Sequence, residues 1–349
     1  MKSKKFVVIM LIIAFVLLLL LATLNYVVDP LFLYHTPWFG MEPIITNERY
    51  QNAGIAKNFE FDNVLLGNSM SENFFILDLN DTFGGHTVKL TAAGSFSIDY
   101  TYTLNILKNR KAHPKYIICN FDQSSISVSP VELKHPLPVF LYDHCFINDA
   151  LYLLNWSITK EYTIETITQN INGSVPDYNT AFVWAFDYDF GKDIVLSDYE
   201  RPEKSEIEPD IESFVENAIA NIDLLTPYFE AMPDTEFVFF HSPYSMAFWD
   251  KATRTNYVEA RKTATLRICD IMTKYENVSY YFWTDKEMLN TISNLNNYKD
   301  TEHYSPEINK EILRRIKAGE GLLTRENYKE EIDKFFDYIY SFDYDSLFE

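Results

Sequence analysis

Five short apolar runs recur along the chain, and helical patterns separate most of them. We expect strands at 63–66, 87–90, 116–121, 236–240 and 278–283, and helical segments at 71–77, 97–108, 211–225 and 252–275. Strands that alternate with helices pair in parallel, because each connection must cross over the sheet. The sequence therefore predicts an α/β fold with three layers, in which helices cover both faces of a parallel sheet.

Two other regions complete this organisation. The region 124–205 is less regular, with several prolines and the aromatic run Ala181–Phe190 (AFVWAFDYDF), and we expect it to form an insertion or a lid. A helix is expected to start at Pro306, with Ser305 as its N-cap, and the acidic tail 325–349 to form a further amphipathic helix.

The N-terminus carries an almost wholly apolar run, Phe6–Leu24. At 1.5 Å per residue, a helix of this length crosses a hydrocarbon core of about 30 Å. Three lysines precede the run, and neither Lys nor Arg follows it until Arg49. The positive-inside rule then predicts a cytoplasmic tail (1–5), a single-pass membrane anchor (6–28) and an extracytoplasmic domain (29–349). A cleaved signal peptide is the alternative, but its apolar core is shorter, about 7–15 residues.

Composition excludes several classes of function. The net charge of -20 repels nucleic acid, so no nucleic-acid partner is expected. The chain contains neither a dinucleotide-binding nor a nucleotide-phosphate glycine motif. No cysteine pair has the spacing of zinc ligands, and we expect neither a metal nor an organic cofactor. Cys119 is expected in the core, and a bond between Cys145 and Cys269 stays open.

The first predicted strand runs into Gly67-Asn68-Ser69. A serine that follows a glycine at the carboxyl end of a strand is how an α/β enzyme presents a nucleophile. The alternative is an ordinary turn serine. Asn73, four residues later, is a candidate substrate-binding residue, or else serves only the first turn of a helix.

Late in the chain, Asp300-Thr301-Glu302-His303 forms a D-x-x-H pattern. Its carboxylate can orient the imidazole, and the imidazole can act as general base on a serine. The pattern follows the fifth predicted strand, so it should lie at the same sheet edge as Ser69. The alternatives are a loop or cap aspartate and a surface histidine. His241, after the fourth predicted strand, is a second candidate substrate-binding residue, or a histidine capped by the strand end.

From about residue 60 to residue 310, these blocks resemble those of the SGNH (GDSL-type) hydrolase superfamily. In that family the nucleophile follows the first strand, as Ser69 does, and an oxyanion-hole glycine follows the second strand, as Gly94 does. The last block matches Asp300 and His303. The third block, often G-x-N-D, departs from the family, because Cys119-Asn120-Phe121-Asp122 places either Asn120 or Asp122 at the position of the donor. A carboxylate there accepts hydrogen bonds instead of donating them.

The resemblance implies a flavodoxin-like sheet and a Ser69–His303–Asp300 triad, with an oxyanion hole from Ser69, Gly94 and Asn120 (or Asp122). It looks closest to membrane-anchored, extracytoplasmic bacterial members, akin to the D-alanyl transfer protein and to polysaccharide O-acetylation proteins. It therefore implies a serine esterase or acyltransferase that acts on O-acyl groups, such as O-acetyl, of a cell-surface carbohydrate or acylated polymer. A membrane-bound acyltransferase is a candidate partner. The alternative is a non-catalytic component of the same fold that binds glycan or a partner protein in cell-envelope assembly.

Overall fold

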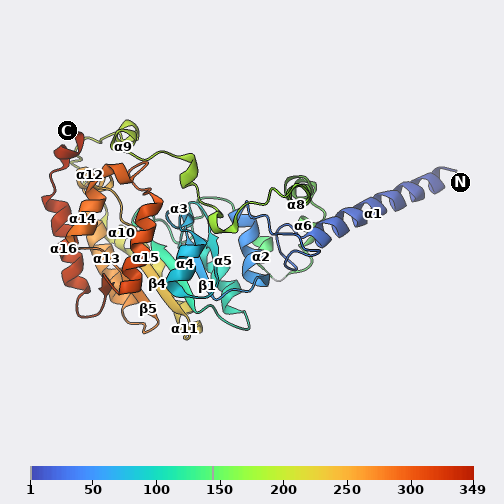
Figure 1. Cartoon of the computed structure of the whole chain (residues 1–349), viewed down its shortest axis with the longest axis horizontal. Helices are drawn as coiled ribbons and strands as arrows, with labels where there is room; N and C mark the ends of the chain where they lie inside the picture. Colours follow the sequence, from blue (N-terminus) through green and yellow to red (C-terminus); the bar gives the residue numbers. More distant parts are fainter. Residues whose placement is uncertain (1, 144) are drawn as a thin grey trace. The chain divides into compact units, whose positions relative to one another are not determined.

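The computed structural model describes residues 2–143 and 145–349, and the chain falls into two compact units (Figure 1). The first unit combines Met1–Glu60 with Leu137–Tyr178. The second combines Phe61–Pro136 with Asn179–Glu349 and contains the whole sheet. The region 124–205 is therefore divided, since its middle part belongs to the N-terminal unit and its two ends belong to the unit with the sheet.

A six-stranded sheet forms the centre of the second unit. Its spatial order is β2-β1-β3-β4-β5-β6, with strands β1 (Asn63–Gly67), β2 (Thr87–Thr91), β3 (Tyr116–Phe121), β4 (Glu236–His241), β5 (Val278–Tyr281) and β6 (Leu322–Leu323). The first five strands pair in parallel, which confirms the predicted α/β class. The sixth was not predicted and pairs antiparallel with β5. Because it is only two residues long, it carries no periodic signal.

Helices of the second unit form two packed sets. The α4 helix packs against α15, and α13 packs against both α10 and α16, as expected of helices on the two faces of a sheet. The helices of this unit are α3 (Ser69–Glu72), α4 (Ile76–Phe83), α5 (Ser97–Lys108), α9 (Lys192–Asp198), α10 (Ile211–Asp223), α11 (Thr226–Ala231), α12 (Met246–Arg254), α13 (Val258–Met272), α14 (Lys286–Ser293), α15 (Pro306–Ala318) and α16 (Tyr328–Ser341), with short 3₁₀ turns at Ala185–Asp187, Leu295–Asn297 and Tyr344–Phe348.

One predicted helix, 252–275, is two helices in the structure. The first, α12, ends at Arg254, and α13 begins at Val258. Between them Asn256 adopts a left-handed backbone with φ of 62°. Asparagine tolerates this conformation better than most residues, so it ends one helix and redirects the chain into the next.

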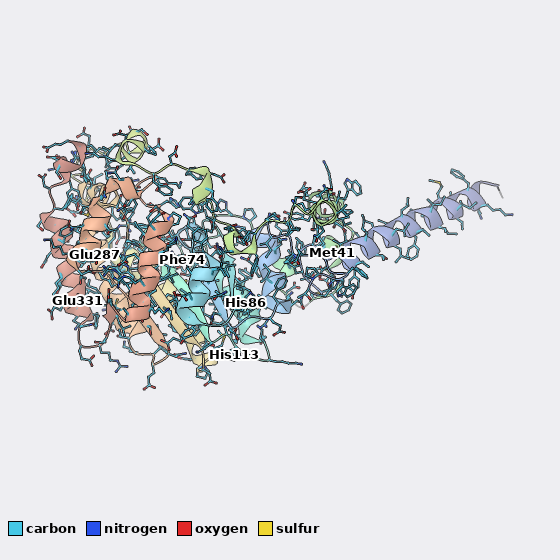
Figure 2. All side chains as sticks on the ribbon, viewed as in Figure 1. Met41, Phe74, His86, His113, Glu287 and Glu331 are labelled. Atoms are coloured by element: carbon cyan, nitrogen blue, oxygen red, sulfur yellow. The ribbon has the colours of Figure 1, made fainter. Side chains whose placement is uncertain are left out.

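Most of the many aromatic side chains build the core. Trp249, Trp283, Phe237 and Phe240 are almost completely buried. Phe74, labelled in Figure 2, is also fully buried, and its ring lies 5.5 Å from that of Phe240. This contact fixes the chain just after Ser69 onto the core of the sheet.

The first unit is helical. It contains α1 (Lys2–Val28), α2 (Glu48–Asn58), α6 (Ala150–Leu153), α7 (Trp156–Ile158), a π-helical turn η2 (Thr159–Thr163) and α8 (Ile164–Asn172), with a short 3₁₀ turn at Val139–Leu141. A further 3₁₀ turn, Tyr178–Thr180, starts at the last residue of this unit. The α1 helix is long and apolar enough to cross a membrane, with a mean hydropathy of 3.3 over its most apolar window. The cysteines of the chain are free, and Cys145 is exposed whereas Cys119 and Cys269 are buried.

Candidate active site

The nucleophile candidate lies on a tight turn at the carboxyl end of β1. Asn68 caps the short α3 helix, because its side-chain Oδ1 accepts a hydrogen bond from the Met70 amide at 3.1 Å. Ser69 is the first residue of that helix. Gly67 is required by space, since a Cβ there would lie 2.3 Å from the Ser71 Oγ and 2.4 Å from the Asn120 Oδ1. The turn therefore lies in direct contact with the end of β3.

Asn120 and Asp122 hold this turn from the side of β3. The Asn120 Oδ1 accepts hydrogen bonds from the Ser71 hydroxyl at 2.8 Å and the Asn68 amide at 3.3 Å. The Asn120 side-chain amide donates to the Asn68 Oδ1 at 3.1 Å, and the Asp122 carboxylate accepts from the Asn68 side-chain amide. Both residues are thus hydrogen-bonded to Asn68, and this contact occupies one of the two N–H groups of the Asn120 side chain. They hold the Ser69 turn in place, and the predicted oxyanion role of Asn120 (or Asp122) stays a prediction.

Ser69, His303 and Asp300 form a continuous chain of hydrogen bonds. The Ser69 Oγ lies 2.8 Å from the His303 Nε2, and the His303 Nδ1 lies 2.8 Å from the Asp300 Oδ2. The other carboxylate oxygen of Asp300 accepts the backbone amides of Glu302 and His303 at 2.9 and 2.8 Å. Ser69 and His303, 234 residues apart in the chain, are therefore brought together at the carboxyl edge of the sheet. The candidate nucleophile, base and orienting carboxylate follow one another in the order that a triad needs.

The environment of Asp300 favours its charged form. Burial alone would raise the pKa of this carboxyl, but the hydrogen bond and charge of His303 and the two backbone amides outweigh burial and hold the pKa well below its ordinary value. Lys299 adds an ion pair at 3.1 Å to the Asp300 Oδ2. The carboxylate therefore stays ionised throughout the neutral range and keeps the proton of the imidazole on Nδ1.

Trp184 completes the site, and we did not identify it from the sequence. Its indole Nε1 donates a hydrogen bond to the Ser69 backbone oxygen at 2.9 Å. Its ring stands perpendicular to the His303 imidazole, with 5.2 Å between the ring centroids. Trp184 belongs to the aromatic run 181–190, which was predicted to be part of an insertion or a lid. Nothing in the sequence of this run distinguishes Trp184 from its neighbours. The tertiary structure alone shows that it touches both the nucleophile turn and the base.

Asn73 anchors this aromatic segment. Its side chain is 1% exposed, and its Oδ1 accepts a hydrogen bond from the Ala185 amide at 3.0 Å. The Lys89 ammonium, also buried, donates to the Glu72 and Ala181 backbone oxygens. The structure therefore gives Asn73 a positioning role behind Trp184, and its burial does not fit the predicted contact with substrate.

We expect Trp184→Phe to lower kcat about fivefold to tenfold. The variant loses the hydrogen bond to the Ser69 backbone, worth about 1 kcal/mol, but keeps a ring against His303. Trp184→Ala, which also removes the ring, should cost more. Steady-state kinetics with a small acetyl ester measure both, and Phe186→Leu, a change at an exposed neighbour in the same segment, is the control. Equal rates for all three variants would contradict this role.

The other predicted oxyanion donors are backbone amides. Gly94 follows β2 in a left-handed turn with φ of 66°, and the amide of Ala92, two residues before it, donates to the Gly67 oxygen at 2.9 Å. This contact places the Gly94 turn beside the nucleophile turn. Within residues 2–143 and 145–349, the amides of Ser69 and Gly94 donate no other hydrogen bond, so both can donate to a bound ligand.

His241 is not part of this site. It ends β4, and its imidazole is 1% exposed, with the Phe282 and Phe335 rings centred 4.4 and 5.6 Å away. Burial lowers the pKa of His241 to about 3, so the ring is neutral. The prediction that His241 contacts substrate is therefore not supported, because its ring packs in the core as an apolar group.

A cavity of about 370 Å³ lies beside the D-x-x-H loop. Thr301 and Glu302 line it together with Arg261 and with aromatic side chains such as Phe248. The Arg261 guanidinium lies 4.8 Å from the centre of the Phe248 ring and donates to the Gln123 backbone oxygen. Burial, aided by the charge of Asp122, raises the pKa of Glu302 to about 7. Glu302 therefore titrates near neutral pH, next to the candidate base.

We expect Glu302→Gln to stabilise the protein at pH 8 but not at pH 5. Folded Glu302 keeps its proton from pH 4.5 to about 7 whereas the unfolded chain loses it, so its ionisation opposes folding as pH rises through this window. The neutral amide escapes this penalty, and we expect a gain of about 1–3 kcal/mol at pH 8. Thermal unfolding of wild type and variant at both pH values measures it, and an equal difference at both would contradict the raised pKa.

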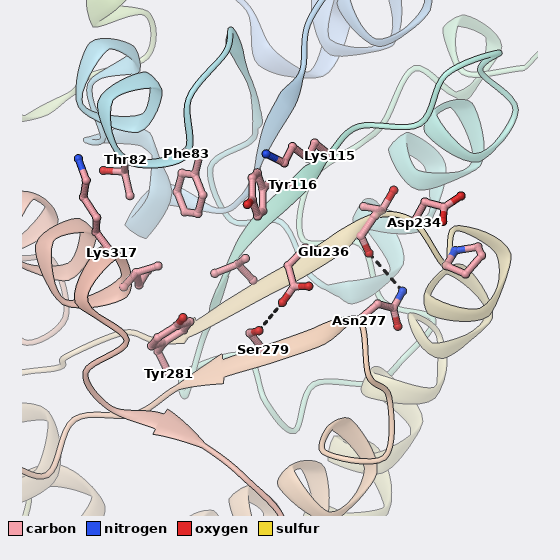
Figure 3. A pocket seen from close by; sticks show the side chains of 14 residues that line it. Thr82, Phe83, Lys115, Tyr116, Asp234, Glu236, Asn277, Ser279, Tyr281 and Lys317 are labelled. Carbon is pink, nitrogen blue, oxygen red and sulfur yellow. Dashed lines mark hydrogen bonds between the residues drawn. The ribbon is translucent and has the colours of Figure 1, made fainter.

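A second cavity, of about 500 Å³, lies at the amino ends of three neighbouring strands (Figure 3). It is lined by Tyr116 and Glu236, the first residues of β3 and β4, and by Ser279 near the start of β5. Glu236 accepts a hydrogen bond from the Ser279 hydroxyl, drawn as a dashed line. Because Ser69 follows the carboxyl end of a parallel strand, this cavity is at the opposite edge of the sheet.

Comparisons with known proteins add little to this geometry. No protein-family profile matches the chain, and neither does any curated protein sequence. A solved structure described as a candidate platelet activating factor from Streptococcus pneumonia matches 84% of this chain and 91% of its own, at 13% sequence identity and a TM-score of 0.37. This likeness is too weak to support a functional argument, which rests on the site itself. Among the residues that the structure describes, no group of His, Cys, Asp and Glu could hold a metal ion.

Proposed function

We propose that this protein is a membrane-anchored serine esterase or acyltransferase. The observation that carries the proposal is the unbroken chain from the Ser69 Oγ through His303 to Asp300, with distances of 2.8 Å at both steps. Such a chain is the requirement for activating a serine hydroxyl, because the imidazole accepts its proton and the carboxylate holds the imidazole in the right tautomer.

The geometry supports a two-step acyl transfer. The Ser69 Oγ attacks the ester carbonyl while the His303 Nε2 takes its proton, and the backbone amides of Ser69 and Gly94 donate to the resulting oxyanion. When the tetrahedral intermediate collapses, His303 returns the proton to the leaving alcohol and an acyl-serine remains. Water, or a hydroxyl of an acceptor, then attacks the acyl-serine while His303 takes its proton. The bond between the acyl group and the Ser69 Oγ breaks, and His303 returns the proton to Ser69. Hydrolysis and transfer differ only in this acceptor.

A cell-surface carbohydrate carrying O-acetyl or similar esters is the proposed substrate. The α1 helix would hold the enzyme at the membrane, with its N-terminus in the cytoplasm, and a membrane-bound acyltransferase is the proposed partner. The Tyr188 ring contacts the Trp184 ring and is 54% exposed, and an exposed aromatic ring suits the apolar face of a sugar ring. Lys299 contacts both Tyr188 and Asp300. Its ammonium lies 4.4 Å from the centre of the Tyr188 ring and forms an ion pair with the Asp300 carboxylate.

Covalent labelling tests this proposal. The full chain, purified in detergent, should react with a serine-directed phosphonate, and peptide mass spectrometry should locate the adduct on Ser69. Turnover of an acetyl ester should fall in parallel with labelling. A folded protein whose Ser69 neither reacts nor turns over acetyl esters would overturn the catalytic proposal.

A non-catalytic role in cell-envelope assembly is the second candidate. The observation that favours it is the Asn120 side chain, whose amide already donates one hydrogen bond to Asn68 and so has one N–H group fewer for an oxyanion. Losing one such donor costs about 10²–10³ in rate. A Ser69→Ala variant that keeps full biological activity would establish this second role and exclude the first.

A further inference from the structure

The first unit exposes many large apolar side chains on a segment that packs against α1. This segment, 146–171, is called the collar. The exposed fractions of these side chains are 80% for Phe146, 72% for Ile147, 56% for Leu151, 63% for Trp156, 45% for Ile164 and 79% for Ile171. Single exposed apolar residues are common on soluble proteins, but so many within one short segment indicate an interaction surface.

The α8 helix of the collar exposes apolar side chains and buries polar ones. Ile164 and Ile171, seven residues apart on one face, point to the outside. Thr166, and Thr163 in the preceding turn, are buried instead, with exposed fractions of 4% and 0%. A helix at the surface of a protein in water shows the opposite arrangement, because its apolar stripe faces the core. The collar therefore presents its apolar stripe to an apolar environment outside the protein.

Contacts at the end of α1 indicate what that environment is. The apolar run of α1 ends at Leu24, and the next residue, Asn25, is fully buried in the first unit. Its side-chain amide donates to the Leu153 backbone oxygen and to the Thr159 hydroxyl, both at 2.9 Å. Its Oδ1 accepts the Thr163 hydroxyl at 2.7 Å. The collar is thus held against α1 where the membrane-spanning run ends, which is the level of the lipid headgroups.

We propose that the collar lies in the interfacial layer of the same bilayer that α1 crosses, as a second, non-spanning membrane contact. The inference rests on the proposed membrane anchoring by α1. Trp156 suits this position, because tryptophan concentrates at membrane–water interfaces. Segment 146–171 contains Asp149, Glu161 and Glu165 but only Lys160 to balance them. Its contact with lipid is therefore apolar, and we expect the collar to bind the bilayer without anionic lipid and without low ionic strength.

Cys145 supplies a natural reporter for the test. It is exposed and precedes Phe146, whereas the other two cysteines are buried. The full chain, labelled at Cys145 with the fluorophore NBD, is placed in phosphatidylcholine nanodiscs that contain lipids with nitroxide at the headgroup or along the acyl chain. We expect at least twofold quenching by the headgroup and shallow acyl-chain nitroxides, unchanged at 0.5 M salt. The variant Phe146→Ser/Ile147→Ser/Trp156→Ser, altered only at exposed positions, should lose this quenching.

A second probe separates this proposal from the anchor on which it rests. In a Cys145→Ser background, Leu17→Cys places the same fluorophore in the middle of the apolar run of α1. Deep quenching at position 17 together with shallow quenching at Cys145 supports the collar. Quenching at position 17 without quenching at Cys145 overturns the collar but leaves the anchor, and would mean that another protein covers this surface. Quenching at neither position overturns both. None of these results depends on the catalytic proposal.

Discussion

Replacement of Ser69 by alanine is expected to reduce ester turnover by a factor on the order of 10⁴–10⁶, to the level left by binding and the oxyanion hole alone. The Ser69 Oγ is the atom that lies 2.8 Å from the His303 Nε2 and the atom that would carry the acyl group. Alanine removes both the nucleophile and the site of covalent labelling. Steady-state kinetics and phosphonate labelling measure the two losses independently.

Ser71→Ala is the matched control for this change. Ser71 lies two residues further along the same turn, and its hydroxyl donates to the Asn120 Oδ1 instead of to His303. We expect this variant to lose some stability, because the Asn120 Oδ1 loses a partner, but to keep phosphonate labelling and most of its turnover. If Ser69→Ala kept the activity and Ser71→Ala lost it, the nucleophile would be wrongly assigned.

Replacement of Asp300 by asparagine is expected to lower kcat by about 10⁴, the effect known for this change in serine proteases. The Asp300 Oδ1 accepts two backbone amides, which the side-chain oxygen of asparagine can still do. The asparagine amide would then face the His303 Nδ1 and donate to it. The imidazole would carry its proton on Nε2, where it can no longer accept the proton of Ser69.

Glu302→Gln provides the control for Asp300→Asn, since it makes the same chemical change in the same loop. The Glu302 side chain lines the neighbouring cavity, and its backbone amide alone is hydrogen-bonded to Asp300. We expect kcat to change less than tenfold in this variant. Comparable losses in the two variants would show that the charge of the loop, and not the orientation of the imidazole, governs the rate.

Much of the fold could be predicted from the sequence, because it depends on local patterns. All five parallel strands are short runs of buried residues, and periodicity reveals such runs without any knowledge of their partners. The strand β6 was missed because two residues show no period. The segment 252–275, which contains neither Pro nor Gly, was predicted as one helix, and only the left-handed backbone at Asn256 separates α12 from α13.

The parts of the candidate site that depend on local spacing could also be predicted, whereas the parts that depend on distant partners could not. The pairing of Asp300 with His303 is local, since three residues on one turn bring both side chains together, and parallel topology then places Ser69 at the same edge. By contrast, the roles of Asn120, Asn73 and Trp184 depend on partners 49 to 115 residues away. Residue type alone does not tell which way an asparagine amide points or which of several aromatic rings reaches a backbone carbonyl.

The sequence by itself therefore determined the α/β class, the apolar α1 helix and the three residues that form the candidate triad. The tertiary structure alone decided that Asn120 supports the nucleophile turn, that His241 packs in the core, that Trp184 joins Ser69 to His303, and that the collar faces outward. The physical reason is that backbone periodicity and close spacing act within a few residues. Hydrogen-bond direction and burial depend on groups that only folding brings together.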